Sequence, residues 1–182
     1  VRPDVRIVAG TVDEGIDGYR PPSLDCAEQL CTDLDIEFIT ISYKDLDFEE
    51  MDTVASLIPD ITKKDSNAPR MPCSYCGVFR RQGINHLAKK VGADVIALGH
   101  NLDDMAQTVL MNMSNGDLER TLRLAPHTTT PIDGLPPRIV PLRWIPEQEI
   151  HLYAVHKNLP IHHEECPHAR GALRWRHREM VA

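Results

Sequence analysis

The sequence lacks the glycine patterns with which the commonest nucleotide-binding folds hold phosphate groups. Its 182 residues include ten glycines, but no two are adjacent, and neither G-x-x-x-x-G-K-[S/T] nor G-x-G-x-x-G occurs. The sequence therefore contains neither a Walker-type P-loop nor a Rossmann dinucleotide fingerprint. Long apolar runs are lacking as well, since none approaches the roughly 20 residues of a membrane-spanning helix. We therefore expect a cytoplasmic protein that does not enter a membrane.

The composition gives no sign of a disulfide-stabilised, disordered or fibrous protein. Hydrophobic residues make up 42% of the chain and charged residues 26%, which is typical of a globular protein. The cysteines number five, and an odd set argues against a disulfide framework. The length corresponds to one domain, so we expect a single core over residues 1–182.

The net charge of −7 is distributed unevenly along the chain. Residues 1–72 carry 7 Lys/Arg against 16 Asp/Glu, whereas residues 73–182 carry 13 against 11. The acidic first part argues against a general polyanion-binding protein. Residues 168–182 are rich in arginine and predict a C-terminal helix, which fits either a local phosphate contact or a solvated surface.

Strand and helix patterns alternate along the chain. The predicted strands are residues 5–12, 36–41, 94–99 and 139–140. The predicted helices are residues 21–34, 77–91, 103–113 and a segment that starts after Pro146. Residues 44–70 are acidic and predict an excursion with one short helix, and residues 125–137 predict a proline-rich loop. This alternation indicates an α/β fold, with a parallel sheet covered by helices on both faces.

Polar residues follow two of the predicted strands. Asp13-Glu14-Gly15 comes after the first strand and Gly99-His100-Asn101 after the third. Ligands of parallel α/β sheets bind beyond the carboxyl ends of the strands, so both clusters mark a candidate site. Asp103 and Asp104 follow at a predicted helix start, where they fit Mg²⁺ binding or acid–base chemistry, or else cap the helix.

Cysteines form the other candidate site. Cys73-Ser-Tyr-Cys76 is a C-x-x-C turn that leads into a predicted helix. Backbone N–H groups at the helix start, and the neighbouring Arg80 and Arg81, favour thiolates there. Two cysteines supply half of a metal site, and Cys166 is the candidate for a third thiolate.

Three interpretations of these cysteines stay open on spacing alone. They are a thioredoxin-like redox pair, a zinc site completed by His163 or His168, and an iron–sulfur cluster on three thiolates with one iron open. The redox pair lacks its usual flanking strand and helix, while zinc and the cluster fit the spacing equally well. Cys26 and Cys31 lie on a predicted helix and fit structural packing.

Six segments occur in the order that is typical of one known family. They are residues 12–20, 72–81, 97–108, 137–142, 147–150 and 165–167. On these segments the sequence resembles the tRNA 2-thiouridine synthetases, the TtcA/TtuA family of PP-loop ATP pyrophosphatases. The single C-x-x-C with one distal Cys-Pro is similar to the TtuA-type archaeal and eukaryotic branch. The resemblance covers about residues 5–178 and implies the PP-loop, adenine-nucleotide α-hydrolase-like fold.

The resemblance implies a metal centre and a basic residue beside it. The family's cluster ligands fall on Cys73, Cys76 and Cys166, which would hold a [4Fe–4S] cluster whose fourth iron has no protein ligand. That open iron is where a sulfide or hydrosulfide nucleophile binds in the family. A basic residue follows the C-x-x-C, and it is Arg80 here, with the implied role of stabilising developing charge.

The resemblance also implies ATP with Mg²⁺ and a two-step reaction. The family's ATP contacts fall near Val12 and Gly99, with Asp104 close to the phosphates and the metal ion. ATP adenylates the C2 oxygen of a tRNA uridine, and sulfur then displaces AMP to give 2-thiouridine. The implied partners are tRNA, which the arginine-rich end fits, and a ubiquitin-like sulfur-carrier protein. The sequence leaves open whether the chain forms a homodimer.

The sequence departs from the family at its beginning. The S-G-G-x-D-S PP-loop, expected one strand and one helix before Val5, does not occur in it, nor do cysteine-rich zinc modules at the ends. We expect that the sequence belongs to a longer protein. If it stands alone, we expect an incomplete sheet edge and weak or no ATP hydrolysis. The alternative function is a PP-loop-less metal-binding relative that docks tRNA or a partner without catalysis.

Overall fold

The computed structural model describes residues 4–122, 134–172, 174 and 177–178. The chain divides into two compact units, Val1–Val91 with Leu159–Ala169 and Gly92–Asn158 with Arg170–Ala182. The single catalytic core over residues 1–182 stays a prediction. Among the helices of the described residues, none is both long and apolar enough to cross a membrane.

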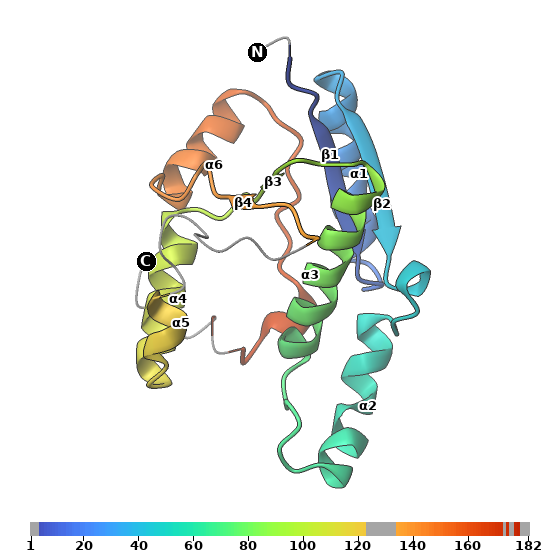
Figure 1. The fold of residues 1–182 in the computed structure, drawn as a ribbon, viewed down its shortest axis with the longest axis vertical. Helices are drawn as coiled ribbons and strands as arrows, with labels where there is room; N and C mark the ends of the chain where they lie inside the picture. Colours follow the sequence, from blue (N-terminus) through green and yellow to red (C-terminus); the bar gives the residue numbers. More distant parts are fainter. Residues whose placement is uncertain (1–3, 123–133, 173, 175–176, 179–182) are drawn as a thin grey trace. The chain divides into compact units, whose positions relative to one another are not determined.

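A parallel two-stranded sheet lies at the centre of the first unit (Figure 1). β1 (Val8–Asp13) and β2 (Glu37–Ser42) pair along their whole length. The sequence predicted that the first strand begins at Val5, but Val5 is 52% exposed and β2 offers a partner only from Glu37 onward. The length of β1 is therefore set by its neighbour rather than by its own β-branched residues.

Two helices cover the two faces of this sheet, which confirms the predicted α/β architecture (Figure 1). α1 (Arg20–Asp33) follows β1, and α3 (Pro72–Lys90) packs on the opposite face. α3 approaches β1 closely at Gly83, where an added Cβ would lie 2.8 Å from a methyl group of Val12. α3 begins five residues earlier than predicted because Pro72 occupies its first turn, a position that suits proline.

The segment 44–70 holds more helix than its acidic composition indicated. A 3₁₀ turn, η1 (Lys44–Leu46), leads into α2 (Met51–Lys64). α2 buries one face through Met51, Val54 and Ile58, which recur at the three- and four-residue spacing of an amphipathic helix. Met51 and Val54 join Val12, Ile41 and Tyr43 in the core of the first unit.

The described residues of the second unit include a shorter parallel pair and the helices α4, α5 and α6. β3 (Ile96–Ala97) pairs with β4 (Arg138–Ile139), so the predicted strand 94–99 is reduced to the two residues that find a partner. The helices are α4 (Leu102–Ser114), α5 (Leu118–Leu122), which the sequence did not predict, and α6 (Glu147–His156).

Two sequence predictions fall largely outside the described residues. The proline-rich loop at 125–137 lies mostly within 123–133, which the structure does not describe. The arginine-rich helix at 168–182 overlaps the described 3₁₀ turn η2 (Pro167–Ala169), but residues 173, 175–176 and 179–182 are outside the description.

Candidate functional site

Asp104, a predicted catalytic and ATP-binding residue, lies in the first turn of α4. Its carboxylate accepts a hydrogen bond from the N–H of Asn101 at 3.2 Å, and the Asn101 side chain accepts from the N–H of Asp104 at 2.9 Å. This reciprocal pair is a capping box. Oδ1 of Asp104 also lies 2.8 Å from Nη1 of Arg174. Helix capping is thus confirmed, while the metal-binding role of Asp104 stays a prediction.

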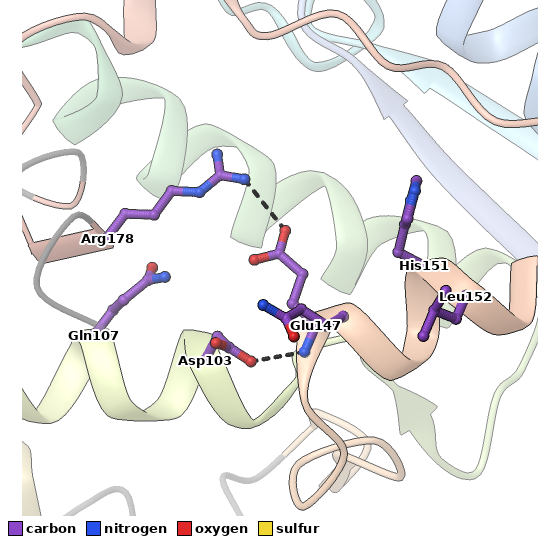
Figure 2. A pocket seen from close by; sticks show the side chains of 7 residues that line it. Asp103, Gln107, Glu147, His151, Leu152 and Arg178 are labelled. Atoms are coloured by element: carbon purple, nitrogen blue, oxygen red, sulfur yellow. Dashed lines mark hydrogen bonds and ion pairs between the residues drawn. The ribbon is translucent and has the colours of Figure 1, made fainter. Parts of the chain in front are cut away.

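A cavity of about 540 Å³ opens beside the neighbouring Asp103. Oδ2 of Asp103 accepts from the N–H of Glu147 at the start of α6, and the Glu147 side chain pairs with Arg178 at 3.4 Å (Figure 2). Arg174 and Arg178, from the arginine-rich end, are therefore both paired with acidic side chains. Their contact with tRNA stays a prediction.

The other residues expected at ATP lie in different units. Val12 is buried in β1 of the first unit, and its carbonyl accepts from Nη2 of Arg20 at 2.6 Å. Gly99 follows β3 in the second unit. A Cβ added to Gly99 would meet no atom of the described residues within 4 Å, so its backbone is open to a close approach. ATP binding at both positions stays a prediction.

The three cysteines that were expected to hold a metal line one cavity of about 170 Å³ in the first unit. Cys73 and Cys76 lie in the first two turns of α3, and Cys166 precedes η2. Arg80 and His168 line the same cavity. The structure therefore brings together, from positions about 90 residues apart, the side chains that the C-x-x-C motif and the distal Cys-Pro singled out.

The thiolates of Cys73 and Cys166 are disfavoured by burial unless a cation is bound. Burial is the largest cause that raises the pKa of the Cys73 thiol, and the charges of Cys166 and Cys76 raise it further. Burial also raises the pKa of Cys166. A backbone hydrogen bond and the charge of Arg80 lower the pKa of Cys73, as predicted, but burial and the neighbouring thiols raise it more. A metal centre fits here, since its positive charge compensates thiolate ligands.

A zinc ion and a [4Fe–4S] cluster would bind these thiolates in different ways. Within the described residues, no three Cys, His, Asp or Glu side chains lie close enough together to hold one metal ion. A zinc ion needs every thiolate about 2.3 Å from one centre. A [4Fe–4S] cluster binds each thiolate to a different iron and so holds the sulfurs further apart. His168, a candidate zinc ligand, has its Nε2 atom 2.6 Å from Oδ1 of Asp52 instead.

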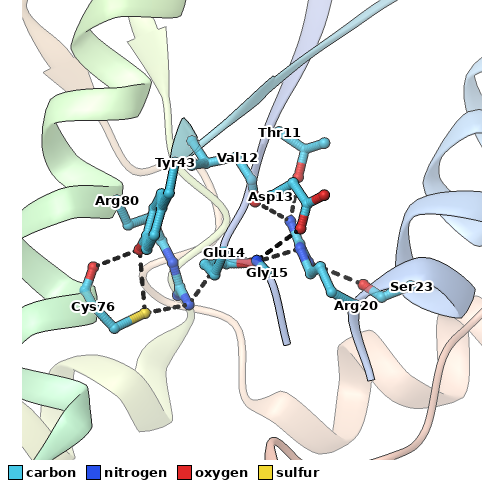
Figure 3. Close-up of polar contacts among 10 residues, drawn as sticks. All are labelled: Thr11, Val12, Asp13, Glu14, Gly15, Arg20, Ser23, Tyr43, Cys76 and Arg80. Atoms are coloured by element: carbon cyan, nitrogen blue, oxygen red, sulfur yellow. Dashed lines mark hydrogen bonds and ion pairs between the residues drawn. The ribbon is translucent and has the colours of Figure 1, made fainter. Parts of the chain in front are cut away.

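A buried carboxylate anchors the arginine beside the cysteines (Figure 3). Glu14 is 3% exposed, and its two oxygens lie 2.8 Å from Nη2 of Arg80 and 2.6 Å from Nε of Arg20. The Nε–H of Arg20 makes no hydrogen bond to the carboxylate, so that contact is an ion pair only. Burial lowers the pKa of Arg80, but the charges of Cys76 and Glu14 raise it more, so the guanidinium stays charged.

Two side-chain donors reach the sulfur of Cys76. Nη2 of Arg80 lies 3.4 Å from Sγ of Cys76, and the hydroxyl of Tyr43 lies 3.4 Å from the same atom (Figure 3). Arg80 was predicted from the sequence and Tyr43 was not, while Glu14 was predicted only as part of a polar cluster after a strand. No local pattern distinguishes Tyr43 from an ordinary core aromatic, whereas the position of Glu14 at a strand's carboxyl end was a usable signal.

No protein-family model matches the chain. A tRNA 2-thiolation protein NcsA from Haloferax volcanii is 41% identical over 181 residues, which cover 94% of this chain and 53% of that protein. A solved structure, of the U34-tRNA thiolase NcsA from Methanococcus maripaludis with its [4Fe–4S] cluster, matches with a TM-score of 0.80 and 32% identity over 98% of this chain and 56% of that one. The chain is thus similar, over nearly its whole length, to tRNA 2-thiolation proteins of the TtuA type.

Eukaryotic members of the tRNA 2-thiolation family show the same extent of similarity. Cytoplasmic tRNA 2-thiolation protein 1 of Drosophila erecta is 38% identical over 93% of this chain and 47% of its own length. The protein of the same name from Chlamydomonas reinhardtii is 40% identical over 94% of this chain and 45% of its own length. The chain therefore spans about half the length of the curated relatives that it matches. The family inferred from six short segments is confirmed.

Proposed function

We propose that the chain is the core of an ATP-dependent tRNA sulfurtransferase, which adenylates the C2 oxygen of a uridine and inserts sulfur to give 2-thiouridine. The observation that carries this proposal is the convergence of Cys73, Cys76 and Cys166 on one cavity. The fold around it matches a thiolase with a [4Fe–4S] cluster. tRNA, MgATP and a ubiquitin-like sulfur carrier are the proposed substrates and partners. The proposed location is the cytoplasm, since the fly and algal relatives carry that word in their names.

The three cysteines would hold the [4Fe–4S] cluster. When bound, the cluster would supply one iron without a protein ligand, at which the sulfur for transfer can bind. The chain fixes the cysteines through local structure. Pro72 sets the start of α3 just before Cys73. The N–H of Ala169 donates to the carbonyl of Cys166 at 2.9 Å and closes the turn that carries the third thiol.

Arg80 would supply a fixed positive charge at the rim of the cavity. Its guanidinium is held by Glu14 and donates to the sulfur of Cys76. An arginine held in advance of the reaction stabilises charge that develops on a substrate without having to reorganise. Arg80 is thus the proposed stabiliser of negative charge during sulfur transfer to the uridine.

The ATP step of the proposal depends on Val12, Gly99 and Asp104. Both oxygens of Asp104 already have partners, the N–H of Asn101 and the guanidinium of Arg174. To bind Mg²⁺, Asp104 has to exchange Arg174 for the ion. An arginine suits that exchange because its guanidinium binds phosphate as well as carboxylate.

A binding module without catalysis is the second candidate function. It is favoured by one observation, that both oxygens of Asp104 already bind groups of the chain itself, the N–H of Asn101 and the guanidinium of Arg174. Such a module would keep the cysteine site and tRNA contact but bind no nucleotide. Isothermal titration of the chain with MgATP separates the two functions, since only the sulfurtransferase core is expected to release or absorb heat on binding.

The direct test is formation of 2-thiouridine. The full-length gene product that contains this sequence is reconstituted with iron and sulfide under anaerobic conditions and incubated with tRNA, MgATP and sulfide, and the digested nucleosides are measured by mass spectrometry. We expect 2-thiouridine with the wild type and with Cys26→Ser, a matched control on α1 whose thiol does not line the cavity. We expect none with Cys166→Ser. Product from Cys166→Ser equal to that from the wild type would overturn the proposal.

A further inference from the structure

Tyr43 is held rigidly at the carboxyl end of β2. The residue is completely buried, at 0% exposure, and its N–H donates to the carbonyl of Asp13 at 3.0 Å. Its ring packs edge-on against Phe48 and Phe79, with centroid distances of 6.3 and 5.5 Å. Phe48 and Phe79 stack on each other at 4.5 Å. The aromatic group therefore fixes where the Tyr43 hydroxyl points.

The hydroxyl of Tyr43 points at Cys76 (Figure 3). It lies 3.0 Å from the carbonyl oxygen and 3.4 Å from the sulfur of that residue. A tyrosine hydroxyl is protonated at neutral pH, so it can act as a donor to these atoms.

The sulfurs of Cys76 and Cys73 have different hydrogen-bonding neighbours. Cys76 faces two side-chain donors, Tyr43 from the end of β2 and Arg80 from the next turn of α3. The thiol of Cys73 instead donates to the carbonyl of His168 at 3.6 Å. A thiolate at Cys76 would therefore be stabilised by hydrogen bonds from two separate elements, which is how charge-assisted hydrogen bonds become strong.

Hydrogen bonds to the sulfur ligands are one of the means by which a protein sets the reduction potential of an iron–sulfur cluster. We propose that Tyr43 is a positioning residue that acts through Cys76: its hydroxyl donates to the Cys76 sulfur and raises the reduction potential of the cluster. This inference rests on the proposed function, since it needs the cluster. It adds a residue that neither the motifs nor the comparisons assign to the site.

Tyr43→Phe tests the inference, because it removes the hydroxyl and keeps the ring that packs against Phe48 and Phe79. Tyr75→Phe is the matched control. Tyr75 is the sequence neighbour of Cys76, but its hydroxyl donates to the carbonyl of Pro69 at 3.1 Å. The midpoint potential of the reconstituted cluster is measured by anaerobic spectroelectrochemistry, and the iron–thiolate stretching bands by resonance Raman spectroscopy. Both methods report only the molecules that carry a cluster.

We expect Tyr43→Phe to shift the midpoint potential downward and the iron–thiolate stretching bands upward, and Tyr75→Phe to match the wild type. Unchanged potential and bands in Tyr43→Phe would mean that the hydroxyl serves only the Cys76 carbonyl, and would overturn the inference while leaving the proposed function intact. Folded Tyr43→Phe that holds no iron would also overturn it, because a tuning donor is not required for loading. A wild type without iron would instead remove the proposed function itself.

Discussion

Oε1 of Glu14 lies 2.8 Å from Nη2 of Arg80, and the carboxylate is buried although the arginine side chain is half exposed. Left to itself, an arginine at a cavity rim samples many rotamers, and most surface ion pairs hold it weakly. Here the acidic partner is fixed inside the protein. The pair therefore places a permanent positive charge against the sulfur of Cys76.

Glu14→Gln is expected to destabilise the fold and to release Arg80. The change leaves the guanidinium groups of Arg20 and Arg80 without their buried counter-charge, which costs about 3 kcal/mol of the free energy of unfolding. Urea denaturation measures that loss. Release of Arg80 is measured by the rate at which phenylglyoxal modifies it, followed by mass spectrometry, and this rate should rise.

Glu50→Gln provides the control for Glu14→Gln. Glu50 pairs with Lys44, and both side chains are open to solvent, so its loss is expected to cost less than about 1 kcal/mol. Equal stability of the two variants, with equal modification of Arg80, would show that Glu14 does not anchor the arginine.

Gly83→Ala is expected to push α3 away from the sheet. The new Cβ would lie 2.8 and 2.9 Å from the two methyl carbons of Val12, which is itself buried and has no room to move. Overpacking of this kind costs about 1–3 kcal/mol of the free energy of unfolding. Gly77→Ala, on the same helix, should lose nothing, because its nearest neighbour would be the end of Arg81 at 3.8 Å. Thermal unfolding of both variants checks the difference; a Gly83→Ala protein as stable as Gly77→Ala contradicts it.

Asp52 is expected to stabilise the protein until acid protonates it, through its contact with His168 in the turn that follows Cys166. Burial raises the pKa of Asp52, but hydrogen bonds from the N–H of Asp17 and from His168 lower it more, so it lies below its ordinary value of 3.8. A lowered folded-state pKa gives stability that is present above pH 3.8 and is lost as the pH falls toward the folded value.

Asp52→Asn is therefore expected to flatten the acid limb of the stability curve. Between pH 6 and pH 3, the free energy of unfolding of the wild type should fall further than that of Asp52→Asn, as measured by urea denaturation at each pH. Parallel curves for the two proteins would mean that Asp52 does not contribute through its ionised form.

Asp104→Asn tests the ATP step. If Asp104 binds the Mg²⁺ of MgATP, the neutral side chain should weaken nucleotide binding at least tenfold, which corresponds to about 1.4 kcal/mol. Asp117→Asn is a suitable control in the same unit, since Asp117 pairs with Arg120 on the surface. Isothermal titration of both variants measures the effect. Wild-type affinity in Asp104→Asn would leave Asp104 with its capping role alone.

The elements of the first unit show what local sequence can and cannot specify. α1 and α3 were predictable because apolar residues recur along them at three- and four-residue spacing and prolines open α1. β1 was predicted too long, since Val5 has no partner strand, and α2 was predicted too short, since acidic residues surround Met51, Val54 and Ile58. Strand length and helix burial depend on neighbours that a linear pattern does not contain.

The candidate site, too, contains residues that the sequence could predict and residues that it could not. Cys73, Cys76 and Cys166 were predictable as one group because the C-x-x-C motif and the distal Cys-Pro match segments of a known family. Tyr43 was not, because its contact with Cys76 joins residues 33 positions apart and its residue type is common in cores. Only the folded chain, which sets the end of β2 against the first turns of α3, gives this tyrosine its place.

The metal content of the anaerobically reconstituted protein shows whether Cys73, Cys76 and Cys166 hold an iron–sulfur cluster. Iron, acid-labile sulfide and zinc are determined on the wild type, Cys166→Ser and Cys26→Ser. In the wild type and in Cys26→Ser, we expect four irons and four sulfides per chain, as a [4Fe–4S] cluster requires. In Cys166→Ser, we expect both to be lost. One zinc per chain without sulfide, or a full complement of iron in Cys166→Ser, would contradict this expectation.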